Sequence, residues 1–145
     1  MEEHTKLMKF LEEYLKDDAL AFAYNFINYC HLIDDIIDEK ISRDNPETII
    51  AAFEAALAVY SNPFYRQHAN HLFPIIKMVT NAYADSVVFQ NAPNEWNVKY
   101  KAVLAQQLND VTLACIEICH GVSQRRYASL AIRELSYNAH KDSFI

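Results

Sequence analysis

The chain has 145 residues, 52% of them hydrophobic, and a net charge of −6 at pH 7, which suits one domain with a core of its own. The acidic balance argues against nucleic acid as the main partner, and no uncharged apolar run reaches the roughly 18 residues that would span a bilayer. The N-terminus lacks the basic and apolar regions of a signal peptide. Three cysteines cannot all pair, which favours reduced thiols and a cytoplasmic location.

Helical periodicity runs along nearly the whole chain, which holds one glycine and four prolines. Pro46 and Pro63 each follow an asparagine and suit the first turn of a helix, where the missing N–H costs little. Gly121 can end a helix in a left-handed cap. The pattern predicts helices at about 3–16, 18–40, 46–61, 63–91, 94–120 and 123–140. We therefore expect an all-α fold, a compact bundle of five or six helices that forms a single domain over residues 1–145.

The second expected helix ends in a cluster of acids. Asp34, Asp35, Asp38 and Glu39 follow a largely apolar run that begins at Ala19, and the three aspartates fall within about 100° of arc on a helix. Acids at a helix C-terminus oppose its partial negative charge, at about 0.3–1 kcal/mol each. Because a divalent cation bound by carboxylate oxygens would offset this cost, the cluster predicts a metal site.

A second polar face lies on the expected helix over 94–120. Gln106, Asp110, Glu117 and His120 project within about 100° of Asn109, and the other faces carry mainly Val, Leu, Ala, Cys and Ile. Asn109 and Glu117 are two turns apart and can offer two oxygen ligands to Mg²⁺, which keeps several waters and takes few protein ligands. Either polar face can instead be the solvated side of an amphipathic helix.

Together the two stretches resemble the metal motifs of class I terpene synthases, in the isoprenoid synthase superfamily. Residues 34–39 are similar to the family's aspartate-rich motif, DDxxD(E), and residues 109–117 to its second motif, (N/D)Dxx(S/T)xxxE. The resemblance implies a helical bundle in which Mg²⁺, or Mn²⁺, binds the diphosphate of an isoprenyl substrate. It implies that Arg66 binds the diphosphate. The metal ligands that it implies are Asp34, Asp35, Asp38, Asn109 and Glu117.

The chain also departs from that family. Leu113 stands at the hydroxyl position of the second motif and offers no oxygen, and Thr112 points about 140° away from Glu117. The pair Arg126 and Tyr127 follows the second motif too soon to match the Arg-Tyr pair of the family. The resemblance covers residues 19–120, and the chain is about half the length of a family catalytic domain.

These patterns favour a minimal, Mg²⁺-dependent terpene-synthase-like enzyme that acts on or binds an isoprenyl diphosphate. One alternative is a non-catalytic helical binding or assembly protein with a relict metal site, which Leu113 and the short chain suggest. A second is an all-α nucleotide pyrophosphohydrolase, which also combines helical acid clusters with Mg²⁺. A third is a ferritin-like di-metal bundle, since Glu117 and His120 have the Glu-x-x-His spacing.

A small bundle leaves little room for a pocket that excludes water, so a second copy of the chain can complete it. We therefore expect a homodimer formed through apolar surface. The residues proposed for this surface are Phe53, Val59, Phe73, Val87 and Phe89.

Overall fold

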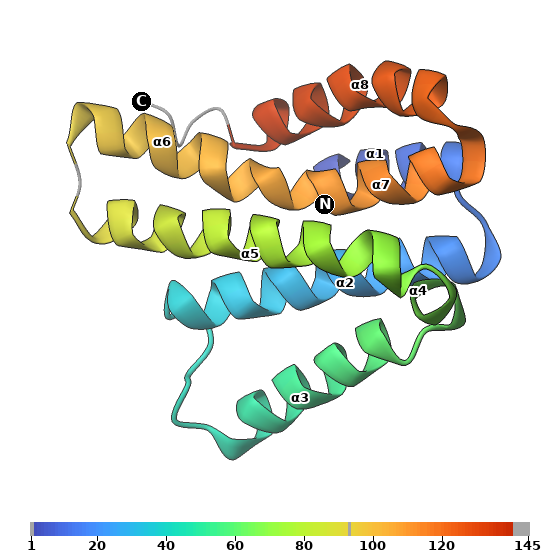
Figure 1. Ribbon diagram of the computed structural model, residues 1–145. Coiled ribbons are helices and arrows are strands. Elements are labelled where there is room, and N and C mark those ends of the chain that lie inside the picture. The colour runs from blue at the N-terminus through green and yellow to red at the C-terminus, as the bar shows by residue number, and fades with distance from the viewer. Residues whose placement is uncertain (1, 93, 141–145) are drawn as a thin grey trace. The chain divides into compact units, whose positions relative to one another are not determined.

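The computed structural model describes residues 2–92 and 94–140, and every regular element in these ranges is a helix (Figure 1). The prediction of an all-α fold is therefore confirmed. None of the described helices has both the length and the apolar character needed to cross a membrane. The elements are α1 (Glu2–Tyr14), α2 (Asp17–Ile37), α3 (Pro46–Tyr60), α4 (Pro63–Gln67), α5 (Ala69–Asn91), α6 (Glu95–Ala105), the 3₁₀ turn η1 (Gln106–Leu108), α7 (Asn109–His120) and α8 (Val122–His140).

Two of the expected helices are each divided in the structure. The helix expected over 63–91 ends at His68, whose backbone N–H donates to the carbonyl oxygens of Phe64 and Tyr65, and a new helix starts at Ala69. The helix expected over 94–120 tightens into η1, where the backbone bonds span three residues instead of four. Neither break contains glycine or proline, which explains why the sequence pattern did not reveal it.

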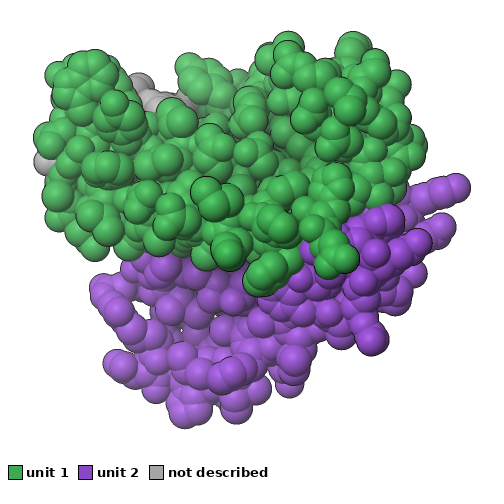
Figure 2. Space-filling view, viewed as in Figure 1, with its two compact units in different colours: residues 1–15, 70–145 green, residues 16–69 purple. Residues whose placement is uncertain are grey.

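Contacts within the chain define two compact units (Figure 2). One unit joins residues 1–15 to residues 70–145 and contains α1, α5, α6, α7 and α8. The other spans residues 16–69 and contains α2, α3 and α4. The single domain expected over residues 1–145 stays a prediction.

In the first unit, α7 lies along α8, and α8 also packs against α1. Every residue from Val111 to Ile116 is buried, so the middle of α7 is covered on all sides. This matches its sequence, which is apolar on nearly every face except at the ends of the helix. Buried residues of the neighbouring helices complete this core: Phe10 and Leu11 of α1, and Ala128 and Ile132 of α8.

Gly121 forms the turn between α7 and α8. Its backbone lies at φ 93° and ψ 175°, a region that is essentially restricted to glycine, and its N–H donates to the carbonyl oxygen of Glu117 at 2.8 Å. The prediction that Gly121 ends a helix is confirmed, but its ψ of 175° lies outside the left-handed helical region expected for the cap. Because the chain reverses here, α8 runs back along α7 (Figure 1).

In the second unit, aromatic side chains join α2 to α4. The ring of Phe22, which is fully buried, lies 5.5 Å from that of Tyr65 and 6.3 Å from that of Phe64, spacings at which aromatic rings attract one another. Val59 of α3 is also fully buried. It is therefore not part of an exposed surface, and its place in the expected dimer face is wrong.

Asparagine caps start α3 and α4, as the Asn-Pro sequences predicted. The Oδ1 of Asn45 accepts from the N–H of Glu47 at 2.9 Å, and the Oδ1 of Asn62 accepts from the N–H of Tyr65 at 3.0 Å. Asn62 is buried and makes a second bond, because its Nδ2 donates to the carbonyl oxygen of Asp18 at 3.0 Å. This second bond ties the start of α4 to the start of α2.

Candidate functional site

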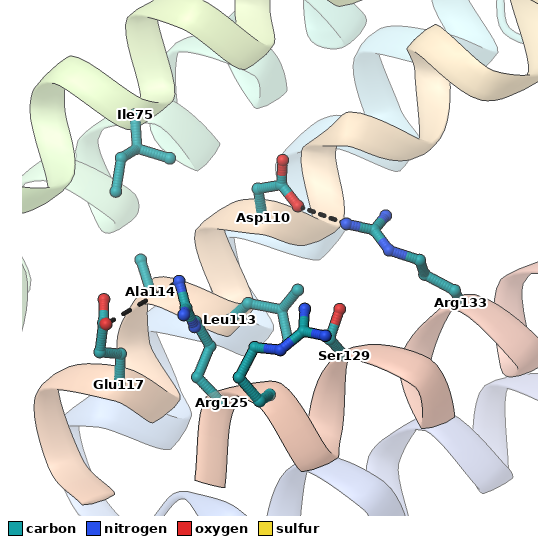
Figure 3. Close-up of a pocket in the computed structure, with 9 residues that line it drawn as sticks. Ile75, Asp110, Leu113, Ala114, Glu117, Arg125, Ser129 and Arg133 are labelled. Carbon is teal, nitrogen blue, oxygen red and sulfur yellow. Dashed lines mark hydrogen bonds and ion pairs between the residues drawn. The ribbon is translucent and has the colours of Figure 1, made fainter. Parts of the chain in front are cut away.

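A pocket of about 350 Å³ lies in the first unit, against one face of α7 and one face of α8 (Figure 3). Its polar wall combines two carboxylates with three arginines, and its apolar wall includes one side chain of α5. The lining residues are Ile75, Asp110, Leu113, Ala114, Glu117, Arg125, Arg126, Ser129 and Arg133.

Helical spacing explains why these residues share one pocket. Asp110 and Glu117 lie seven residues apart on α7, and Arg125, Ser129 and Arg133 lie four residues apart in turn on α8, so each set follows one face of its helix. Because the chain reverses at Gly121, Asp110 and Glu117 of α7 lie opposite the arginines of α8.

Two ion pairs join these faces. The Oδ1 of Asp110 accepts a charge-assisted hydrogen bond from the Nη2 of Arg133 at 3.0 Å. The Oε1 of Glu117 lies 3.9 Å from the Nη1 of Arg125, and its Oε2 lies 3.9 Å from the Nε2 of His71 in α5. Figure 3 shows the Asp110 and Glu117 carboxylates each pointing toward its arginine. The Glu117 contacts are long enough that the carboxylate is only loosely held.

Arg125 retains an unused hydrogen-bond donor. Its Nε is buried and has no hydrogen-bond partner among the described residues, and a buried donor without an acceptor destabilises the structure that contains it. Because the Nε has almost no accessible surface, a ligand in the pocket can bond to it only after the side chain of Arg125 turns. The long contact with Glu117 is the ion pair of Arg125 among the described residues.

The second predicted motif is divided between two roles. Glu117 and Asp110 line the pocket, and Leu113 forms part of its apolar wall. Asn109 instead donates from its Nδ2 to the Oγ of Ser136 at 2.8 Å, which ties the start of α7 to α8. The Nε2 of His120 is in hydrogen-bonding contact with the carbonyl oxygen of Tyr14, so this ring is engaged with the end of α1.

The first predicted motif lies at the end of α2 in the second unit. Asp34 and Asp35 belong to the last turn of α2 and Asp38 follows it; all three are half-buried. The N–H of Asp38 donates to the carbonyl oxygen of Asp34 at 2.8 Å, and the carboxylate of Asp35 lies 4.0 Å from the Nζ of Lys40. Arg66 lies in the last turn of α4 in the same unit, and its side chain is exposed.

The donor chemistry of both motifs fits Mg²⁺ only in part. Among the residues that the structure describes, no three His, Cys, Asp or Glu side chains gather to hold a metal ion. Mg²⁺ often takes only one or two carboxylates and completes its shell with water and substrate phosphate oxygens. Glu117 and Asp110 in the pocket, or Asp34 and Asp38 at the C-terminal end of α2, fit this phosphate-dependent mode of binding.

Arg125 and Arg133 are pocket residues that the sequence analysis did not assign. A signal was present, since Arg125, Ser129 and Arg133 recur at a helical spacing on the last helix. That spacing shows a polar face of α8 but not its counterpart on α7. Arg126, which the sequence presents as part of an Arg-Tyr pair, also lines the pocket.

A scan against protein-family models and searches of curated proteins and solved structures find no match to this chain. The resemblance to terpene synthases therefore rests on the residues of the two motifs.

Proposed function

We propose that this chain is a Mg²⁺-dependent, terpene-synthase-like protein that binds the diphosphate end of an isoprenyl substrate. The observation that supports this most is that Asp110 and Glu117, from the second motif, line one pocket together with three arginines. A diphosphate is recognised by cations, and a bound Mg²⁺ needs a small number of carboxylate oxygens beside it. The pocket offers both kinds of group.

In this proposal the metal ligands are Glu117 with Asn109 in the first unit, and Asp34, Asp35 and Asp38 in the second. Bound Mg²⁺ would act as a Lewis acid that offsets the charge of the departing diphosphate. Glu117 is suited to the role because its contacts with Arg125 and His71 are both long, so little interaction energy is lost when it turns to a metal. Arg66, exposed in α4, is the arginine that the resemblance implies for diphosphate binding.

The dimensions of the pocket agree with the diphosphate end of such a substrate. Its volume of about 350 Å³ lies near the lower end of the about 300–1,000 Å³ of small-molecule sites. Ile75, Leu113 and Ala114 provide an apolar wall beside the charged groups. This wall can contact the first carbons of an isoprenyl chain, and Leu113 then serves as a contact for the chain where the family motif has a hydroxyl.

Thermal unfolding with defined ligands tests the proposal. Mg²⁺ together with geranyl diphosphate should raise the Tm more than either does alone, because both bind only the native state. The double variant Asp34→Asn with Asp38→Asn, and the single variant Glu117→Gln, should each lose most of this combined increase. Asp44→Asn is a matched control, since Asp44 is an exposed aspartate outside both motifs.

A combined increase that is the same in the wild type and in all variants would reject both motifs as the metal site. Release of inorganic diphosphate from geranyl diphosphate, measured in the same samples, separates the enzyme from a binding protein with a relict site. Release of diphosphate from a nucleoside triphosphate, with none from geranyl diphosphate, would support the pyrophosphohydrolase instead.

A further inference from the structure

The pocket carries more positive than negative charge. Three arginines and two carboxylates line it, which leaves one positive charge in excess. Asp110 pairs with Arg133 and Glu117 with Arg125, and no ion pair involves Arg126 among the described residues. A concave site with an excess of guanidinium groups attracts anions and raises their local concentration.

The donors are arranged in a line along α8. Arg125, Ser129 and Arg133 lie on three successive turns of one face, and all three line the pocket. The side chain of Arg125 is 36% exposed, and its 3.9 Å contact with Glu117 is too long for a hydrogen bond, so its terminal nitrogens can donate to a ligand. Guanidinium groups bind phosphate oxygens through two parallel N–H bonds. Two of them on one helix face, with a hydroxyl between them, offer donors to an anion with several phosphate oxygens, such as diphosphate.

We propose that this pocket binds a diphosphate group directly through Arg125, Ser129 and Arg133, without a divalent cation, and that Asp110 and Glu117 compete with the diphosphate for the two arginines. The inference goes beyond the proposed function, because it requires neither Mg²⁺ nor an isoprenyl chain. The carboxylates hold the arginines in place while the pocket is free of ligand. They must release the arginines when the diphosphate binds.

The competition has a measurable consequence for Glu117. If Glu117 weakens diphosphate binding in the absence of metal, Glu117→Gln should bind diphosphate more tightly in EDTA. The substitution removes both a competitor for Arg125 and a negative charge. If Glu117 also holds Mg²⁺, as the proposed function states, the same variant weakens binding when Mg²⁺ is present. The sign of the effect therefore reverses with the metal only if both statements hold.

Isothermal titration of the full chain with inorganic diphosphate tests the inference, at low ionic strength and with EDTA to remove divalent cations. The wild type should bind. Asp110→Asn and Glu117→Gln should each bind roughly two- to fivefold more tightly, the range expected for loss of a partly exposed ion pair. Arg133→Gln should bind at least about tenfold more weakly, since it removes charged hydrogen bonds to the ligand.

Arg43→Gln is the matched control, because Arg43 is an exposed arginine that also pairs with a carboxylate, that of Glu39. Its affinity should equal that of the wild type. If Arg133→Gln fails to fold, the two carboxylate variants still decide, since removing a carboxylate from this pocket tightens binding only if the diphosphate binds there.

Three results would overturn the inference. The first is the absence of wild-type binding in EDTA, and the second is equal or weaker binding by Asp110→Asn. The third is binding of inorganic phosphate as tight as that of diphosphate, which would exclude a site for two linked phosphates. Loss of the Mg²⁺ and geranyl diphosphate response alone would reject the proposed function and leave this inference intact.

Discussion

At the scale of single residues, the three cysteines differ in how far they are buried, a difference that the sequence does not reveal. All three are free thiols: Cys115 is buried, Cys30 is half-buried and Cys119 is exposed. Burial raises the pKa of each thiol, that of Cys30 to about 12, where the negative charge of Asp34 adds to the effect. Because only the thiolate is a nucleophile, a raised pKa lowers the reactivity of a thiol at any given pH below it.

We therefore predict that iodoacetamide at pH 8 labels Cys119 first and Cys115 last in the folded chain. Access and thiolate fraction act in the same direction, since Cys115 is the most buried of the three thiols. Peptide mass spectrometry after short pulses measures the three rates. In guanidinium chloride the rates should converge, and labelling of Cys115 as fast as Cys119 in the folded state would contradict the burial of α7.

Residue identity alone predicted only part of the candidate site. Glu117 and Asp110 were singled out as polar groups on an apolar helix, and both line the pocket. Asn109 belongs to the same polar face but bonds to Ser136. Helical periodicity gives the direction of a side chain about its own helix, and it contains no information on which neighbouring helix supplies a partner.

At the scale of elements, the two asparagine caps make a matched pair that separates capping from tertiary bonding. Asn45 is exposed and caps α3 only, whereas Asn62 is buried, caps α4 and donates to Asp18. We predict that Asn45→Ala lowers the free energy of unfolding by about 1 kcal/mol. Asn62→Ala should lower it by about 2 kcal/mol, because the bond to the carbonyl oxygen of Asp18 is lost together with the cap.

Urea unfolding followed by circular dichroism measures both changes. Asn62→Asp provides a further comparison, since the carboxylate keeps the acceptor for the N–H of Tyr65 and loses the donor for Asp18. Asn62→Asp should lower the free energy of unfolding by more than Asn45→Ala does. Equal costs for Asn45→Ala and Asn62→Ala would show that the bond from Asn62 to Asp18 contributes nothing to stability.

At the scale of the whole molecule, the expected homodimer remains a prediction, and the structure changes which residues are candidates for its interface. Phe53 and Leu57 of α3 are 68% and 67% exposed, and Ile49, Ile50 and Tyr60 are exposed on the same helix. An exposed apolar surface of this kind is typical of interfaces, and a helix face paired with its own copy gives the two-fold symmetric contact that is commonest in homo-oligomers.

We predict that the chain is a dimer in light scattering at micromolar concentration. The double variant Phe53→Ser with Leu57→Ser should be monomeric and should retain its helical circular dichroism, because both side chains are exposed. Tyr127→Ser is the control, since Tyr127 is an exposed aromatic residue of α8. A wild type that is monomeric at all concentrations would contradict the prediction.

The sequence by itself determined the helical class, the starts of α3 and α4 and the end of α7. These features depend on local interactions: the spacing of apolar residues along one helix, an asparagine beside a proline, and a glycine free to adopt a positive φ. The breaks at His68 and at residues 106–108 were missed, because the apolar pattern continues through them.

Only the tertiary structure decided that Asp110 and Glu117 lie opposite Arg133 and Arg125, with an unpartnered Nε beside them. That arrangement depends on how far α8 turns back along α7 after Gly121 and on the rotation of each helix about its own axis. Both are set by the packing of buried side chains from α1, α7 and α8. Such packing joins residues that are distant in the sequence, so no local pattern could predict which charges would meet.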